Sequence, residues 1–153
     1  MEKSIENKPC IVVSACLMGM CVRYDGIVKN TLSCLDKLSE KYRLVPVCPE
    51  MLGGLGIPRL QSEIKGGRVI NIEGKDVTEQ FKKGAEEAYK IFKENNAEFA
   101  LLKESSPSCG VNTVYDGTFT GRKINGYGIT AGYFKEKGIK VISEKNIDEL
   151  KEL

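Results

Sequence analysis

The alternation of short apolar runs with amphipathic stretches constrains the fold of this chain most. The runs are rich in β-branched residues, as buried parallel strands are. Between them apolar residues recur at helical spacing, as at Val77, Phe81, Ala85 and Ala88. We predict strands in 10–16, 43–48, 98–103 and 140–143, a small strand or hairpin arm in 68–72, and helices in 30–42, 76–94, 126–137 and 147–153. Strands and helices in this order predict an α/β fold: a Rossmann-like, mainly parallel sheet with helices on both faces.

Length and composition predict a single domain over residues 1–153. The chain is 41% hydrophobic and 29% charged, which is ordinary for a globular protein. Its longest apolar stretches are too short to span a membrane, and its first residues lack the apolar core of a secretory signal. We therefore expect a cytoplasmic protein. Its 6 cysteines would stay reduced there, which favours metal or thiolate chemistry over disulfides.

The charge balance and the absence of histidine exclude several function classes. The 23 basic and 21 acidic side chains give a net charge of +2, which offers no electrostatic case for a nucleic-acid groove. With 0 histidines the chain cannot build a Ser-His-Asp triad, a Cys-His dyad or a His-ligated zinc site. We expect a small-molecule partner, with acid-base work left to Glu, Asp, Lys, Tyr or a thiol.

Three cysteines each follow an apolar run: Cys16, Cys48 and Cys109. Parallel sheets bind ligands beyond the carboxyl ends of their strands, so three thiols from distant segments can converge there. Such a set can hold a soft metal or an iron-sulfur cluster with one coordination position open. The spacing between these cysteines matches no compact ferredoxin or zinc-ribbon motif, so the pattern becomes specific only if the fold brings them together.

The other cysteines have simpler interpretations. Cys10 begins the first strand, at the far end of the sheet from the predicted site, and Cys34 lies within a helical pattern, so both are interpreted as small buried hydrophobes. Cys21 lies near Cys16 but without a CxxC spacing, and its role stays open. Each of the three strand-end cysteines, taken alone, could likewise be a small buried hydrophobe and not a ligand.

Two long loops rich in glycine, proline and serine, 49–66 and 105–121, are expected to flank the site. Arg23, Arg59 and Lys103 lie in or near them and could offset ligand charge or bind a carbonyl, although exposed salt pairing is the commoner role of such residues. The loops contain few aromatic rings, which argues against the stacking that holds single-stranded nucleic acid.

Several motifs in one order carry a resemblance to a known family. They are VSACLMG with CVRYDG (13–26), VPVCPEMLGGLGIPR (45–59), GKDVTEQFKKGAE (74–86), LLKESSPSCG (101–110), YDGTFTG (115–121) and GYGITAGYFKEKGI (126–139). Together they resemble the 2-thiouracil desulfidase family over nearly the whole chain. Two differences lie beside the motifs: Gln61-Ser62-Glu63, where similar proteins often have Pro-Ala-Glu, and Val22 before Arg23, with Cys21 shifted beside it.

The resemblance implies a 4Fe-4S cluster held by Cys16, Cys48 and Cys109, with a fourth iron open to the sulfur of a thiolated base. It also implies a catalytic carboxylate at Glu50 and a functional serine at Ser106. The expected reaction is hydrolytic removal of sulfide from 2-thiouracil or a related thiolated pyrimidine. Simpler interpretations are a first-turn helix glutamate for Glu50 and a turn-forming hydroxyl for Ser106.

Two other functions remain open at the level of sequence. One is desulfuration of thiouridine in a nucleoside or in tRNA, which the small net charge does not favour. The other is a non-catalytic iron-sulfur or zinc-binding module.

Overall fold

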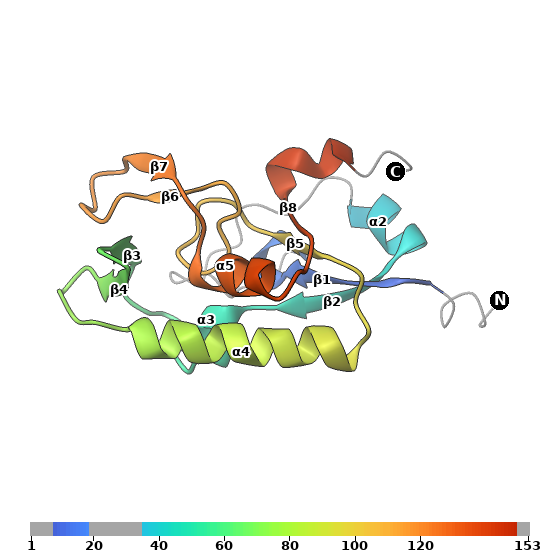
Figure 1. The fold of residues 1–153 in the computed structure, drawn as a ribbon, viewed down its shortest axis with the longest axis horizontal. Coiled ribbons are helices and arrows are strands. Elements are labelled where there is room, and N and C mark those ends of the chain that lie inside the picture. The colour runs from blue at the N-terminus through green and yellow to red at the C-terminus, as the bar shows by residue number, and fades with distance from the viewer. Residues whose placement is uncertain (1–7, 19–34, 150–153) are drawn as a thin grey trace.

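A four-stranded parallel sheet forms the centre of the computed structural model, which describes residues 8–18 and 35–149 (Figure 1). Its strands are β1 (Cys10–Ser14), β2 (Arg43–Val47), β5 (Ala100–Leu102) and β8 (Val141–Ser143), in the order β2-β1-β5-β8. Every pairing in this sheet is parallel. The predicted fold class, a mainly parallel sheet with helices, is confirmed.

The register of this sheet brings the predicted ligand segments to one edge. Ser14 at the end of β1 pairs with Val47 at the end of β2, and β5 pairs with β1 on the other side. Chain segments that leave these strands therefore emerge side by side. The 3₁₀ helix η1 (Ala15–Met18) follows β1, and the short helix α3 (Pro49–Leu52) follows β2 after Cys48.

Helices cover both faces of the sheet. On one face α4 (Thr78–Glu94) and α5 (Ile129–Glu136) pack Phe92 and Phe134 against Val12 and Leu102. On the other face α2 (Leu35–Lys41) packs Leu38 against Ile11. The final helix expected in 147–153 differs: a 3₁₀ segment, η2 (Glu144–Glu149), follows β8, and residues 150–153 lie outside the described residues.

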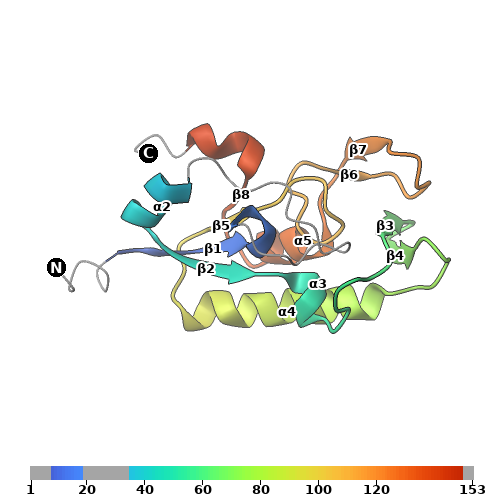
Figure 2. The ribbon, with the colours of Figure 1, turned by 180° about the vertical axis from the view of Figure 1, so that it is seen from behind.

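Two hairpins occupy segments where the sequence predicts long loops and, in 68–72, a small strand or hairpin arm. They are β3 (Ser62–Lys65) with β4 (Arg68–Asn71), and β6 (Thr113–Tyr115) with β7 (Lys123–Asn125). Figures 1 and 2 show both hairpins at the same end of the molecule, beyond the carboxyl edge of the sheet. Strands this short bury few side chains, so their periodicity was too weak to predict most of them.

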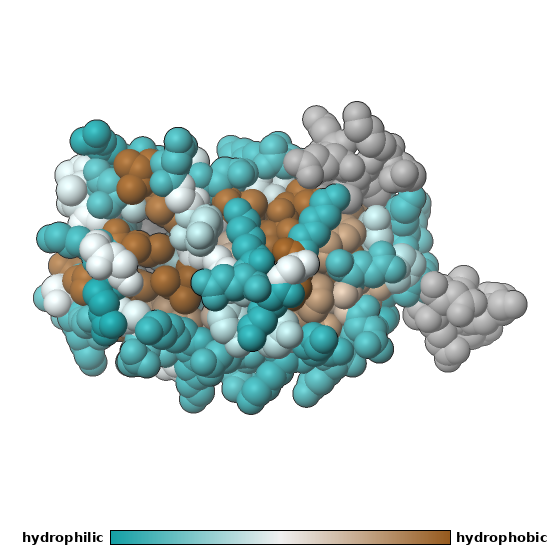
Figure 3. Space-filling model, in the orientation of Figure 1, coloured by the Kyte–Doolittle hydropathy of each residue, from teal (hydrophilic) through white to brown (hydrophobic). Residues whose placement is uncertain are grey.

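The surface at the hairpin end carries apolar side chains among polar ones. Figure 3 shows hydrophobic residues over this end of the displayed face. Among the exposed hydrophobic residues are Ile72, which follows β4, and Ile124 of β7. Beneath it a small separate core joins Val69 of β4 to Val77 and Phe81 at the start of α4. This core fixes the β3–β4 hairpin on α4. Among the described helices, none combines the length and apolar character needed to cross a membrane.

Backbone contact between α3 and α4 fixes the segment after β2. A Cβ on Gly84 of α4 would lie 1.9 Å from the carbonyl oxygen of Pro49, and one on Gly53 would lie 2.0 Å from that of Gln80. Glycine at both positions therefore lets α3 lie directly on α4. Because Cys48 and Glu50 flank Pro49, this contact also sets their position.

Candidate active site

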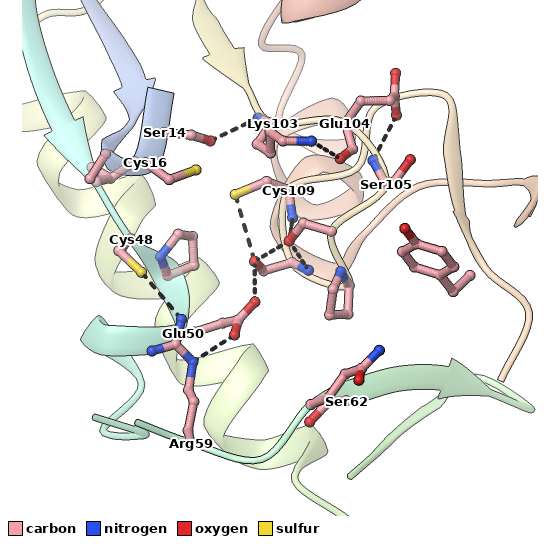
Figure 4. A pocket seen from close by; sticks show the side chains of 18 of the residues that line it. Ser14, Cys16, Cys48, Glu50, Arg59, Ser62, Lys103, Glu104, Ser105 and Cys109 are labelled. Atoms are coloured by element: carbon pink, nitrogen blue, oxygen red, sulfur yellow. Dashed lines mark hydrogen bonds and ion pairs between the residues drawn. The ribbon is translucent and has the colours of Figure 1, made fainter. Parts of the chain in front are cut away.

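A cavity of about 260 Å³ opens at the carboxyl edge of the sheet, and all five predicted site residues line it. Cys16 follows β1, Cys48 and Glu50 flank the start of α3, and Ser106 and Cys109 come from the loop after β5. Figure 4 shows the three cysteine sulfurs facing a common space. The fold thus supplies the convergence that the spacing of the cysteines could not establish.

The three thiols are electrostatically coupled. Burial raises the pKa of Cys109 to about 12; hydrogen bonds from Ser14 and Ser108 act against this rise, while Cys16 and Cys48 add to it. Burial also raises the pKa of Cys48. Burial and the mutual repulsion of the thiolates both oppose deprotonation here, and bound cationic iron would offset both effects.

Glu50 forms a buried ion pair at the cavity wall. Arg59 Nε lies 2.8 Å from Glu50 Oε1, and the two side chains are 7% and 16% exposed. The salt pairing expected for Arg59 is present, but its side chain is enclosed at the cavity and not exposed. Glu50 is also the first-turn acidic residue of α3, so the simpler interpretation as a first-turn helix glutamate and a place at the cavity both apply.

A chain of hydroxyls joins Glu50 to the cysteine loop. Ser108 Oγ donates to Glu50 Oε2 at 3.1 Å and lies 3.0 Å from Ser106 Oγ. Ser106 Oγ also accepts from the backbone N–H groups of Ser108 and Cys109, both at 3.1 Å. Ser106 therefore shapes the turn, as its simpler interpretation proposed, and reaches the carboxylate through Ser108.

Glu104 organises the loop that carries these serines. It is 5% exposed, and its carboxylate accepts from the backbone N–H groups of Ser105, Val111, Asn112 and Thr113 and from the Asn112 side-chain amide. Burial raises the pKa of Glu104, but these hydrogen bonds outweigh it and hold the pKa at about 2. A carboxylate that is charged at neutral pH thus holds the backbone of residues 105–113 in place.

Lys103 at the cavity wall is also engaged. Its Nζ lies 3.3 Å from Glu144 Oε2 and donates to the Glu104 carbonyl oxygen at 3.1 Å. The salt pairing expected from sequence is present here. Arg59 and Lys103, the two cations of the described lining, each face a carboxylate.

Comparison with known proteins decides the family. The family model described as 2-thiouracil desulfurase matches residues 11–146. The chain belongs to the 2-thiouracil desulfurase family. One relative in this comparison is the uncharacterized protein YbbK of Bacillus subtilis (strain 168), 40% identical over 150 residues, with 92% of this chain and 99% of YbbK covered. The resemblance noted in the motifs is confirmed.

A solved structure matches this member of the 2-thiouracil desulfurase family over nearly its full length. It is the [4Fe-4S]-dependent thiouracil desulfidase TudS, with a TM-score of 0.88, 44% identity, and 94% of this chain and 95% of that chain covered. The name assigns a 4Fe-4S cluster and a thiouracil substrate to TudS itself.

The donor set of this desulfurase-family chain suits an iron-sulfur cluster. Three thiols and one carboxylate line the cavity, and thiolate is the usual protein ligand of such clusters. Among the described residues, no three His, Cys, Asp or Glu side chains gather around the position of one metal ion. A cubane cluster is larger than one ion and takes one thiolate per iron, so its ligands stand farther apart.

Other sequence predictions fall away from the cavity or outside the described residues. Cys10 is buried at the start of β1 and is absent from the cavity lining, as expected. Cys21, Arg23 and Cys34 lie in 19–34, outside the described residues. Ser108 and Glu104 were missed. Ser108 could have been found by its place beside Cys109, but nothing in the sequence marks Glu104 as buried.

Proposed function

We propose that this protein is a 4Fe-4S-dependent desulfidase that hydrolyses 2-thiouracil or a related thiolated pyrimidine. Water supplies the new oxygen, the C=S carbon becomes C=O, and sulfur leaves as hydrogen sulfide with no net redox change. The observation that carries this proposal is one cavity lined by Cys16, Cys48, Cys109 and Glu50 in a chain of this family. The match to TudS supports the choice of cofactor and substrate class.

Cys16, Cys48 and Cys109 would hold three irons of the cluster. When bound, the cluster supplies a Lewis-acidic iron with an open position, which polarises a soft C=S group and accepts sulfur. The protein then needs no imidazole for this step, in keeping with its 0 histidines. Burial of Cys109 at 4% exposure keeps solvent away from that ligand.

Glu50 is proposed to take the proton of the attacking water. Arg59 and Ser108 each donate to a different oxygen of this carboxylate, which fixes its plane. A carboxylate oxygen has two lone-pair directions, so each oxygen keeps one for water. Ser106 would orient Glu50 indirectly, because its contact with the carboxylate runs through Ser108.

The cavity supports a free base more than a polynucleotide. Its volume of about 260 Å³ lies below the roughly 300–1,000 Å³ of pockets that take drug-sized ligands. Arg59 and Lys103 already face carboxylates, so neither is placed to receive a phosphate. We expect faster desulfuration of free 2-thiouracil than of thiolated tRNA, with little salt dependence. A preference for tRNA, or a steep fall in rate with salt, would favour the RNA-modifying alternative.

The test compares ligand, base and control variants purified without oxygen. Cys→Ala at Cys16, Cys48 or Cys109 is expected to abolish both cluster absorbance and sulfide release. Glu50→Gln should keep the absorbance and lower kcat by about 10² to 10⁴, the usual contribution of general acid-base catalysis. Cys10→Ala is the matched control, since that thiol is buried but outside the cavity, and it should retain both.

Three outcomes would contradict this assignment. Near-parental turnover by Glu50→Gln would remove Glu50 as the base. Intact cluster content after loss of any one of the three cysteines would remove that cysteine from the ligand set. A parent protein that binds a cluster but releases no sulfide from 2-thiouracil would favour a non-catalytic module.

A further inference from the structure

Arg59 is a cationic side chain whose contacts join the proposed base to a proposed cluster ligand. Its Nε donates to Glu50 Oε1 at 2.8 Å, and its Nη2 lies 4.0 Å from Cys48 Sγ. The third nitrogen, Nη1, donates to the Gly56 carbonyl oxygen at 2.7 Å. Figure 4 shows the guanidinium between the carboxylate and the sulfur.

The geometry of these contacts depends on the planar guanidinium. Its three nitrogens point in fixed directions within one plane, and here each nitrogen meets a different acceptor. A lysine ammonium carries the same charge but presents it as a point with rotatable donors. Arginine therefore fixes the spacing between carboxylate and thiolate, whereas lysine supplies only charge.

Burial distinguishes this pair from an ordinary salt bridge. Arg59 is 7% exposed, whereas Arg68, which pairs with Asp76 at 2.9 Å, is 48% exposed. Exposed pairs typically contribute about 0–1 kcal/mol, because water screens them. A buried guanidinium must instead be held by its acceptors, and Glu50 and Cys48, both proposed working groups of the site, are among the acceptors of Arg59.

We propose that Arg59 is a positioning residue with two separable effects: it orients Glu50 for catalysis, and its charge stabilises the Cys48 thiolate and so tunes the cluster. This inference rests on the proposed function. Donors to cluster sulfurs and nearby charge both set cluster potential. Groups that orient metal ligands typically contribute about 10–100-fold to metal affinity or activity.

The test uses Arg59→Gln and Arg59→Lys, with Arg68→Gln as the matched control from an exposed pair. Arg59→Gln should lower kcat about 10–100-fold, with KM near the parental value. It should also move the midpoint potential of the cluster to a more negative value, because positive charge beside Cys48 is lost. Arg59→Lys should keep the potential near parental but not restore kcat. Arg68→Gln should change neither.

A double-mutant cycle checks that Arg59 acts through Glu50. In the Glu50→Gln background, Arg59→Gln should change kcat less than about 3-fold, because the carboxylate it orients is already gone. Iron content and thermal unfolding are measured for every variant, and kcat is expressed per cluster. If Arg59→Gln fails to fold, Arg59→Lys still separates charge from geometry.

Three results would overturn the inference: full rescue of kcat by Arg59→Lys, an unchanged midpoint potential in Arg59→Gln, or equal effects of Arg59→Gln with and without Glu50. A parent protein without a cluster or without turnover would refute the proposed function itself. That failure is visible before any Arg59 variant is made.

Discussion

Replacing Gly84 with alanine tests whether backbone contact between α3 and α4 sets the active site. In an exposed helix, Gly→Ala would stabilise by about 1 kcal/mol. Here the new Cβ would lie 1.9 Å from the Pro49 carbonyl oxygen, well inside the 3.0 Å that real Cβ contacts respect. Backbone must therefore move by about 1 Å, and overpacking of this kind typically costs about 1–3 kcal/mol, occasionally more.

The clash should exceed the gain in helix propensity, so we expect Gly84→Ala to lower the free energy of unfolding by about 1–2 kcal/mol. It should also lower kcat about 10²-fold, because a displacement of about 1 Å in positioned groups can have that effect. The displaced helix begins at Pro49, between Cys48 and Glu50.

Gly132→Ala in α5 is the matched control. Its Cβ would meet the Tyr127 ring at 2.7 Å, but Tyr127 is 54% exposed and can turn away. The free energy of unfolding of this variant should equal the parental value or exceed it by up to about 1 kcal/mol, and its kcat should be unchanged. Urea unfolding and sulfide release are measured for both. Equal stability of the two variants, with full activity in Gly84→Ala, would refute the argument.

Three further predictions concern the loop after β5 and the site. The pKa of Glu104 is held at about 2, below the usual 4.5, so its stabilisation is complete at neutral pH and is lost progressively as the pH falls from about 4.5 through about 2. Urea unfolding of Glu104→Gln should therefore show a loss of about 3 kcal/mol at pH 7 that shrinks to about half near pH 3; a pH-independent loss would contradict this. Ser108→Ala should keep iron content and lower kcat about 10-fold, because Glu50 loses one donor; unchanged kcat would contradict it. Sulfide release from 2-thiouracil should vary little between low and moderate salt, and a steep dependence would indicate phosphate recognition.

The central sheet was predictable because its strands are continuous apolar runs that need both faces covered. The run 10–16 contains β1, and 43–48 contains β2, each within a residue or two. The other arms of the hairpins were not predictable, because residues such as Ser62 and Lys123 lie in short, partly or fully exposed strands whose order depends on tertiary contact.

The candidate site was also predictable only in part. Cys16, Cys48 and Glu50 lie directly after strands, so topology alone brings them to one edge. The partners of Glu50 depend on how two loops fold back: Arg59 returns from the loop after α3, and Ser108 arrives from 58 residues farther along the chain. No local pattern encodes such pairings, and the family resemblance supplied the role of Glu50 but not its partners.

Iron and acid-labile sulfide, counted per chain on protein purified without oxygen, test the central claim most directly. The account predicts about four of each in the parent protein, as one cubane cluster requires, and a loss of both in Cys109→Ala. Zinc at about one per chain without sulfide, or a full cluster retained by Cys109→Ala, would contradict it.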